Sequence, residues 1–265
     1  VNSGGGTVIY QSVLTGLAPG TTYHYRVTAG SWRDEDRTFT TAPTEAVDFT
    51  FVVGSDPQGF CEGPEAHEPT ISMMQHMAAS GADIALSVGD MAEDGDYYSD
   101  TRVFFLDRTV KYLAREIPLM VVWGNHDVPG DIIRDFADPA SGNYSFDYAG
   151  CHFTCIDDNS RTDYNWVESD LQQAVANNAR HIFLFVHRPP YCERWYDGES
   201  DFRDNLVPLL EQYGVDICFS GHTHEYERGL LNDVYYCMTG GGSWLDIGEP
   251  VVYDWPHMTV GGAHN

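Results

Sequence analysis

The feature that most constrains the fold is a regular alternation of short apolar segments with helical patterns, which begins at Val47. The apolar segments are rich in Val, Ile, Leu and Phe, as is typical of buried strands, and they occupy residues 49–53, 84–88, 119–123, 182–186 and 215–219. The helical patterns occupy residues 69–80, 102–115, 166–178 and 202–213. Residues 144–148 and 152–156 flank an Ala-Gly pair and predict a hairpin. The alternation predicts an α/β fold with helices on the faces of a sheet.

The first 45 residues follow a different pattern. Strands are predicted at residues 8–13 and 37–41, and residues 17–27 indicate a turn that leads into an alternating strand. This last segment reads Leu-Ala-Pro-Gly-Thr-Thr-Tyr-His-Tyr-Arg-Val and resembles the tyrosine-corner region of a fibronectin type III domain. A complete sandwich of that kind needs about 100 residues. Residues 1–45 are therefore predicted to be the C-terminal part of such a domain.

The charge of the chain argues against two classes of partner. Among 265 residues, 40 are acidic and 14 are basic, and the formal net charge is -26. Such a field repels a nucleic-acid backbone and an anionic membrane surface, so general binding to either is not expected. No apolar run approaches the ~20 residues that a membrane helix needs. An acidic surface with Lys111 as the only lysine suits a saline or extracellular setting, and an exported protein of bacterial type is expected.

Six cysteines are present, but they lack the spacing of a zinc ribbon. Cys218 lies inside an apolar segment and is predicted to be a small core residue. Disulfides are possible among the others, which are Cys61, Cys151, Cys155, Cys192 and Cys237, and their pairing stays open.

Each of the apolar segments runs directly into residues that can bind a metal ion. The segment ends read Gly54-Ser-Asp-Pro-Gln58, Gly89-Asp90, Gly124-Asn-His-Asp127, His187-Arg-Pro-Pro190 and Gly221-His-Thr-His224. Ligand sites of α/β sheets form beyond the carboxyl ends of the strands, so these residues are expected to converge. Taken singly, each is more often a turn residue, a helix cap or a core histidine. The repetition at every segment end favours one metal site.

This set resembles the calcineurin-like metallophosphoesterase superfamily, whose signature is Asp-x-His, Gly-Asp-x-x-Asp, Gly-Asn-His-Asp or Glu, a lone His and Gly-His-x-His. The fibronectin-like segment and the sequence Gly-His-Thr-His-Glu-Tyr-Glu-Arg at residues 221–228 are similar to the purple acid phosphatases and their bacterial relatives. The resemblance implies a central β-sandwich flanked by helices. This catalytic domain would span residues 46–265, with its C-terminal end cut short, after a partial all-β sandwich.

The resemblance also implies two metal ions, iron with zinc, manganese or a second iron. Asp56 and His224 would hold the first ion with Gln58 as a weaker ligand, Asn125, His187 and His222 would hold the second, and Asp90 would bridge both. A hydroxide between the ions would attack phosphorus. His126 would contact the phosphate or protonate the leaving group, and Asp127 would orient its ring.

The sequence departs from the family pattern in three places. Gln58 replaces a histidine, which predicts a labile first site. Glu93 stands where purple acid phosphatases have a metal-binding tyrosine, so no purple colour is expected; its side chain would support a ligand or face solvent. The plant and animal enzymes carry a further substrate-binding histidine shortly after the lone His, but this chain has none between Pro190 and Ser200. Arg188 or Arg194 could bind the phosphate instead, although surface ion pairs are equally compatible with both.

Some further residues could line the site. His67 and His257 lie near motif segments and could reach the pocket, and Tyr97 is expected on its rim. The glycines at residues 240–242 are expected to allow close backbone packing near the metals. Specificity is expected to lie in residues 58–68, 91–100, 128–142 and 188–200.

The predicted function is hydrolysis of phosphate monoesters, with a small phosphate ester as substrate. A phosphodiesterase or nucleotide pyrophosphatase is the enzymatic alternative, because the same metal core serves both. The non-enzymatic alternative is an exported binding protein built on the same scaffold. The oligomeric state stays open.

Overall fold

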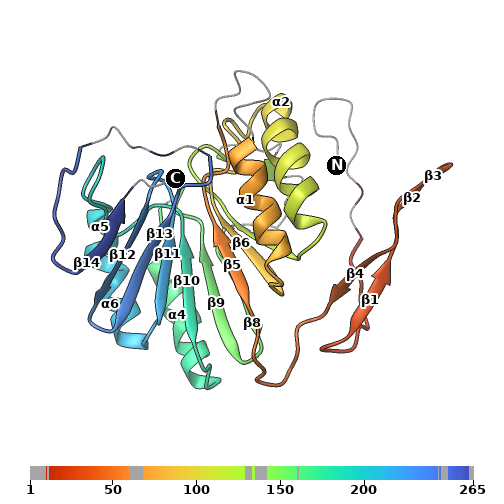
Figure 1. The fold of residues 1–265 in the computed structure, drawn as a ribbon. Helices are drawn as coiled ribbons and strands as arrows, with labels where there is room; N and C mark the ends of the chain where they lie inside the picture. The colour runs from red at the N-terminus through yellow and green to blue at the C-terminus, as the bar shows by residue number, and fades with distance from the viewer. Residues whose placement is uncertain are drawn as a thin grey trace.

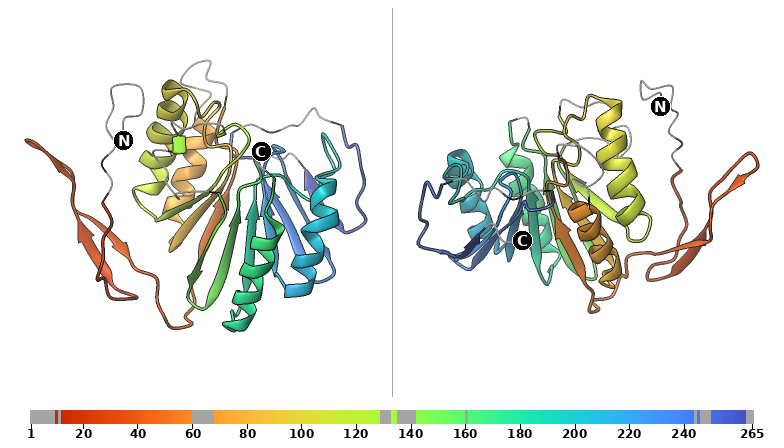
Figure 2. Two further views of the ribbon diagram at one scale, coloured as in Figure 1. Left: turned by 180° about the vertical axis from the view of Figure 1, so that it is seen from behind. Right: turned by 45° about the horizontal axis from the view of Figure 1, so that its top comes forward.

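The computed structural model describes residues 10, 12–59, 68–128, 133–134, 142–159, 161–243, 245 and 250–262. Two sheets pack face to face in the body of the molecule (Figures 1 and 2). The smaller sheet has the order β5-β6-β7, and the larger has the order β14-β12-β13-β11-β10-β9-β8.

The seven segments predicted as strands between residues 49 and 219 each form a strand, and their ends agree to within about two residues, the usual uncertainty of element ends. The strands at residues 226–231, 234–239 and 258–262 were not predicted. The smaller sheet contains β5 (Phe51–Gly54), β6 (Ile84–Val88) and β7 (Leu119–Val122), all parallel. The larger sheet contains β8 (Tyr144–Tyr148), β9 (Cys151–Ile156), β10 (Ile182–Val186), β11 (Ile217–Ser220), β12 (Tyr226–Leu231), β13 (Val234–Thr239) and β14 (Met258–Gly262). The predicted hairpin is confirmed as the antiparallel pair β8 and β9.

Helices cover the outer face of each sheet. The helices α1 (Glu68–Ala79), α2 (Tyr98–Asp100) and the π-helical η2 (Thr101–Ala114) lie on the side of the smaller sheet, where Met74 and Leu113 pack under Ala85. The helices α4 (Tyr164–Ala176), α5 (Ser200–Asn205) and α6 (Val207–Tyr213) cover the larger sheet (Figure 2). The predicted sandwich with helices on both sides is therefore confirmed.

The prediction of a single helix at residues 202–213 is wrong in one respect, because the chain forms two helices there. α5 ends at Asn205, and α6 begins at Val207 with Pro208 in its first turn. Proline has no N–H for a preceding carbonyl and is tolerated only at the start of a helix, so a new helix begins here.

Phenylalanine side chains fill the space between the two sheets. Phe153 on β9 is fully buried, and its ring lies 5.5 Å from that of Phe51 on β5 and 6.1 Å from that of Phe185 on β10. These rings belong to one cluster that also includes residues of β6, β7 and β11. The cluster fixes the spacing of the sheets and therefore of the loops at their carboxyl ends.

The N-terminal part contains only two short strand pairs among its described residues. β1 (Thr22–Tyr25) pairs with β4 (Arg37–Thr40), and β2 (Thr28–Ala29) pairs with β3 (Trp32–Arg33). The Ala18 N–H donates to the Tyr23 hydroxyl at 2.8 Å, as a tyrosine-corner segment would. No described residue from 12 to 45 is buried. The strand predicted at residues 8–13 lies partly outside the described residues, and those described form none.

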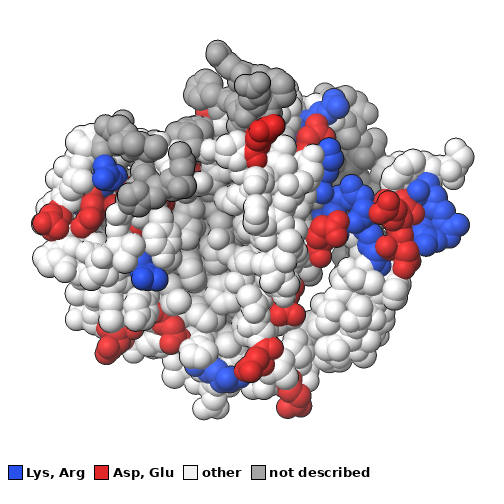
Figure 3. Space-filling model, in the orientation of Figure 1, with Lys and Arg blue, Asp and Glu red and all other residues white. Residues whose placement is uncertain are grey.

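Charged side chains join this N-terminal part to the body. Arg37 contacts Glu116 at 3.1 Å, and Arg115 contacts Asp34 at 3.5 Å. The largest group of basic side chains on the face drawn in Figure 3 lies on this side, next to acidic ones. Each pair has one partner that is more than a third exposed, and ion pairs near the surface contribute about 0–1 kcal/mol each.

Five cysteines, Cys151, Cys155, Cys192, Cys218 and Cys237, are buried and free, so the disulfides considered possible among them are not formed. Cys218 packs in the core as predicted. Cys61 and His67 lie outside the described residues. No helix within the described ranges has both the length and the apolar character to cross a membrane.

Candidate metal centre

The loops that follow β5, β6, β10 and β11 meet at one place. The His222 N–H donates to both carboxylate oxygens of Asp56, at 3.1 and 3.0 Å, which joins the end of β11 to the end of β5. The Nδ1 atom of His187 lies 2.8 Å from the carbonyl oxygen of Val88, which joins the end of β10 to the end of β6. The predicted convergence of strand ends is therefore present.

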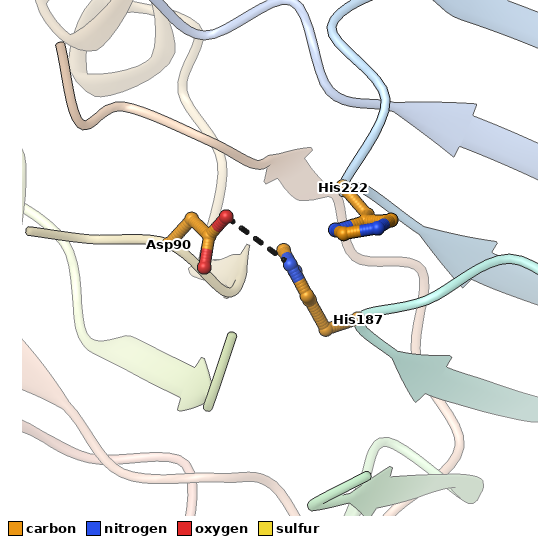
Figure 4. A group of neighbouring side chains, drawn as sticks. All are labelled: Asp90, His187 and His222. Atoms are coloured by element: carbon orange, nitrogen blue, oxygen red, sulfur yellow. Dashed lines mark ion pairs between the residues drawn. The ribbon is translucent and has the colours of Figure 1, made fainter. Parts of the chain in front are cut away.

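Asp90, His187 and His222 form a compact group that could hold a metal ion. Their ligand atoms all lie within 4.8 Å of one another. Figure 4 shows the side chains of Asp90 and His187 pointing toward each other, with His222 beside them, and Asp90 Oδ2 is 3.3 Å from His187 Nε2. Asn125 Oδ1 lies 3.2 Å from the same Nε2 atom.

The hydrogen bond of His187 selects the ring nitrogen that faces this group. Because Nδ1 donates to the carbonyl of Val88, the neutral ring carries its lone pair on Nε2. That lone pair is directed at Asp90 and Asn125, where a cation would lie. A backbone carbonyl on the far nitrogen is the usual support of a metal-binding histidine.

Asp56, His224 and Gln58 form a second group of possible ligands, and Gln58 joins it to Asp90. Asp56 is fully buried, and its Oδ1 is 3.7 Å from His224 Nε2. Gln58 Nε2 donates to Asp90 Oδ2 at 3.1 Å. The buried Gln58 Oε1 has no hydrogen-bond partner among the described residues, and a buried carbonyl oxygen without a donor is costly unless a cation binds it. The donors present thus fit a metal ion.

Three of these residues have a backbone conformation that L-amino acids rarely adopt. The φ angles of Asp56, Asp90 and His222 are +57°, +50° and +74°. Each such residue costs of order 1–3 kcal/mol and persists only when the surrounding structure holds it. The strain turns all three side chains toward the centre, which is the arrangement expected of a functional site.

Small residues let the loops approach so closely. A Cβ atom on Gly124 would overlap the Asp90 carboxylate, and one on Gly221 would overlap the side chains of Ser55 and Asp56. The glycines predicted to allow close packing behave in the same way, since a Cβ on Gly242 would meet the carbonyl oxygen of Ser55.

The buried charges of the centre depend on one another. Burial raises the pKa of the Asp56 carboxyl well above its ordinary value, and Asp90 adds to this shift. Burial opposes a charge on His187, yet the carboxylates of Asp90 and Asp56 raise its pKa to about 10. Burial and the charge on His187 lower the pKa of His222 to about 3. A cation at the centre would supply the positive charge that the His187 proton otherwise provides.

The expectation that Asp127 orients the His126 ring is wrong. Asp127 Oδ1 accepts the N–H groups of Met91 and Ala92 at 2.9 and 3.2 Å, and Oδ2 accepts the N–H of Gly124 at 2.9 Å. With both oxygens engaged by backbone, Asp127 instead ties the loop after β6 to the loop after β7.

Glu93 holds the His126 ring, and it does so through its backbone. His126 Nδ1 donates to the Glu93 carbonyl oxygen at 2.8 Å, whereas the Glu93 carboxylate is 3.9 Å away. The His126 N–H donates to Asp90 Oδ1 at 2.8 Å. A sequence cannot identify a backbone acceptor, because every residue carries one.

Both arginines considered for phosphate binding form ion pairs with buried carboxylates. Arg188 contacts Asp158 Oδ1 at 3.2 Å, and Arg194 contacts Glu225 Oε2 at 3.1 Å. Both arginines therefore form ion pairs, as the alternative interpretation expected, and phosphate binding by either stays a prediction.

Asp158 was missed by the sequence analysis. It lies two residues after the end of β9, which is parallel to β10, so its position beyond a strand end was the available signal.

Two other expected pocket residues lie in different surroundings. His257 packs in an aromatic cluster with Tyr191, Tyr236 and Trp255, at ring distances of 4.5, 6.3 and 5.7 Å. It joins no described group of candidate ligands. Tyr97 is 62% exposed, as a rim residue would be.

Comparisons with known proteins identify the family of this chain and support its fold. A model of the family described as calcineurin-like phosphoesterase matches residues 49–226. Purple acid phosphatase 22 of Arabidopsis thaliana is 29% identical over 244 residues, covering 80% of this chain and 51% of that protein. The probable inactive purple acid phosphatase 27 of the same plant is 30% identical and covers 68% of this chain and 34% of its own length. The chain spans about half the length of the first curated relatives it matches.

The structure of purple acid phosphatase PPD1 from yellow lupin superposes with a TM-score of 0.75 at 20% identity, covering 94% of this chain and 55% of that one. This likeness supports the fold. The family model spans residues 49–226, a range that includes every candidate ligand. The chain therefore belongs to the calcineurin-like phosphoesterase family.

Proposed function

We propose that this chain hydrolyses phosphate monoesters at a centre that holds two metal ions. The observation that carries the proposal is the position of Asp90. Its Oδ2 atom meets His187 Nε2 at 3.3 Å and Gln58 Nε2 at 3.1 Å, and its Oδ1 atom accepts the His126 N–H at 2.8 Å. A carboxylate that contacts a member of each proposed ligand group is suited to bridge two cations.

Each group of donors would hold one ion. Asp56, His224 and Gln58 would bind the first, Asn125, His187 and His222 would bind the second, and Asp90 would bind both. When bound, the ions supply Lewis acidity and an activated water for attack on a phosphoryl group. The mixture of carboxylate, imidazole and amide oxygen suits iron with zinc, manganese or a second iron.

His126 is the residue placed to act on the substrate. Its side chain is 38% exposed, so a substrate can reach it, while its Nδ1 is held by the Glu93 carbonyl. The Nε2 atom then remains for a phosphate oxygen or for the proton of the leaving group. Glu93 in place of a tyrosine predicts a protein without purple colour.

The wider context of the chain is part of the proposal. Export is supported by the net charge of -26 and the single lysine. Residues 1–45 are proposed to be the end of a fibronectin type III-like domain, supported by the hydrogen bond between Ala18 and Tyr23. The substrate is proposed to be a small phosphate ester.

The test is metal analysis of protein purified without chelator, together with hydrolysis of a chromogenic phosphomonoester and the matching diester across pH. About two ions per chain with faster hydrolysis of the monoester is the expected result. Faster hydrolysis of the diester would identify a phosphodiesterase on the same centre. Full metal loading without hydrolysis of either ester would leave a binding protein.

A further inference from the structure

An exposed tryptophan stands directly beside the candidate metal centre. Trp195 lies in the loop between β10 and α5, and it is 52% exposed. Its ring centroid is 5.1 Å from that of His222, and the two planes are inclined by 32°. Tyr196 stands nearly perpendicular to both rings, 6.0 Å from Trp195 and 5.7 Å from His222. Two aromatic side chains thus border the imidazole of a candidate ligand.

The loop holds Trp195 in a strained conformation. Its φ angle is +70°, in a region that is unfavourable for a bulky residue. Arg203 anchors the loop by donating to the carbonyl oxygens of Pro190 and Asp197, both at 2.8 Å. Trp255 Nε1 donates to the carbonyl of Cys192 at 3.1 Å. Trp195 therefore lies in a loop held by hydrogen bonds, and backbone strain that the surroundings maintain is a frequent mark of a functional role.

What distinguishes Trp195 from other exposed apolar side chains is its position, because its half-exposed ring lies against the imidazole of a candidate metal ligand. Indole rings bind planar aromatic groups by offset or edge-to-face stacking. Charge offers little alternative for recognising the leaving group, because Arg188 and Arg194 are engaged with Asp158 and Glu225.

We propose that Trp195 forms an aromatic platform for the leaving group of the substrate, and that the preferred substrates are phosphate esters with a planar aromatic group, such as aryl phosphates or nucleotides. This inference rests on the proposed function and adds a substrate class to it. Phosphate would bind at the metal centre beside His222, and the aromatic group would lie against the exposed part of the indole.

The first experiment compares phenyl phosphate, a nucleoside 5′-monophosphate and glycerol 2-phosphate as substrates of the metal-loaded protein. Trp195→Ala should raise KM for the aromatic esters by about 3- to 10-fold, the range expected for one stacking contact, while kcat changes less. KM for glycerol 2-phosphate should not change, and Trp195→Phe should restore most of the aromatic affinity. KM for the nucleoside 5′-monophosphate shows whether a base that is separated from the phosphate by a ribose also stacks on Trp195.

Trp32→Ala is the matched control, because Trp32 is 55% exposed in the N-terminal part. It should leave every KM unchanged. If Trp195→Ala weakens all three substrates equally and lowers metal content, Trp195 only supports His222 and the proposal is overturned. Unchanged KM values for all three substrates would overturn it as well.

A binding measurement separates this inference from the proposed activity. Calorimetry with phenylphosphonate and methylphosphonate, which are not hydrolysed as esters, should give tighter binding of the phenyl compound to wild type and equal binding of both to Trp195→Ala. This result would support the platform even in a protein that hydrolyses no ester. Equal binding of the two phosphonates to wild type would overturn it.

Discussion

The two sheets of the sandwich contribute different chemistry to the centre. The smaller sheet contributes oxygen donors from the loops after its strands, namely Asp56, Gln58, Asp90 and Asn125. The larger sheet contributes imidazoles from the loops after β10 and β11, namely His187, His222 and His224. The oxygen half carries the negative charge, and the imidazole half balances it. Neither half is a complete site, so the metal centre depends on how the sheets pack.

The charge balance shows how closely the halves depend on each other. His187 belongs to the larger sheet, yet carboxylates of the smaller sheet raise its pKa to about 10. Asp56 belongs to the smaller sheet, yet it accepts the N–H of His222, which is 166 residues away in sequence. Substitutions of the oxygen donors, of the imidazoles and of the core residues between the two sheets therefore test whether each half needs the other.

The largest effect is expected from Asp90→Ala in the oxygen half. Removing the proposed bridge should abolish binding of both ions and lower turnover by more than about 1,000-fold, since bound metals supply several kcal/mol of transition-state stabilisation. His222→Ala and His224→Ala in the imidazole half should each remove one ion. Elemental analysis and ester hydrolysis measure these outcomes, with the exposed Asp107→Ala as control. Two retained ions in Asp90→Ala would disprove the bridging role.

A large loss of turnover without loss of metal is expected from His126→Ala. Proton transfer by a positioned side chain contributes about 100- to 10,000-fold, and His126 is not one of the proposed ligands. Glu93→Ala should change turnover only slightly, because its backbone carbonyl holds the ring. Steady-state kinetics with metal analysis tests both variants. A normal rate for fully loaded His126→Ala would remove this residue from the mechanism.

Phe153→Ala tests the layer that joins the halves. Truncation of a fully buried phenylalanine should lower the free energy of unfolding by about 3–5 kcal/mol. Phe39→Ala, at a half-buried position in β4, should cost less. Urea denaturation of metal-free protein measures both. Equal losses would show that packing between the sheets is no more important than packing in the N-terminal part.

The smallest effect is expected on the pH dependence of stability, from His152, an imidazole on β9 that lies outside the candidate metal centre. Burial opposes a charge on His152, but Asp170 and Asp147, at 3.0 and 2.7 Å, raise its pKa above the ordinary value. A raised pKa stabilises the fold fully below the unfolded value of about 6.5, and the gain is lost as pH rises through the folded value.

Relative to His152→Gln, wild type should therefore gain about 1 kcal/mol or less near pH 5.5, and this gain should shrink as pH rises through the raised folded pKa. Unfolding by urea at several pH values measures the difference. Asp170→Asn should remove most of its pH dependence. A difference that stays constant with pH would show that His152 does not titrate as the contacts indicate.

The strands from β5 to β11 and most helices of the body could be predicted because burial leaves a local periodic pattern in the sequence, whereas β12, β13 and β14 were missed. The candidate ligands could be identified because each follows a strand directly. The partner of His126 could not, because the acceptor is a backbone carbonyl. The ion pairs of Arg188 and Arg194 could not be chosen over phosphate binding, because Asp158 and Glu225 lie far from them in sequence.

The sequence by itself determined which donors stand at the ends of the buried strands, since chain direction and apolar periodicity are local properties. Only the tertiary structure decided which strands belong to each sheet, that Asp90 contacts both His187 and Gln58, and that Trp195 lies against His222. These relations arise where segments far apart in the chain pack together. Their geometry depends on the shape of the whole core, which no short stretch of sequence encodes.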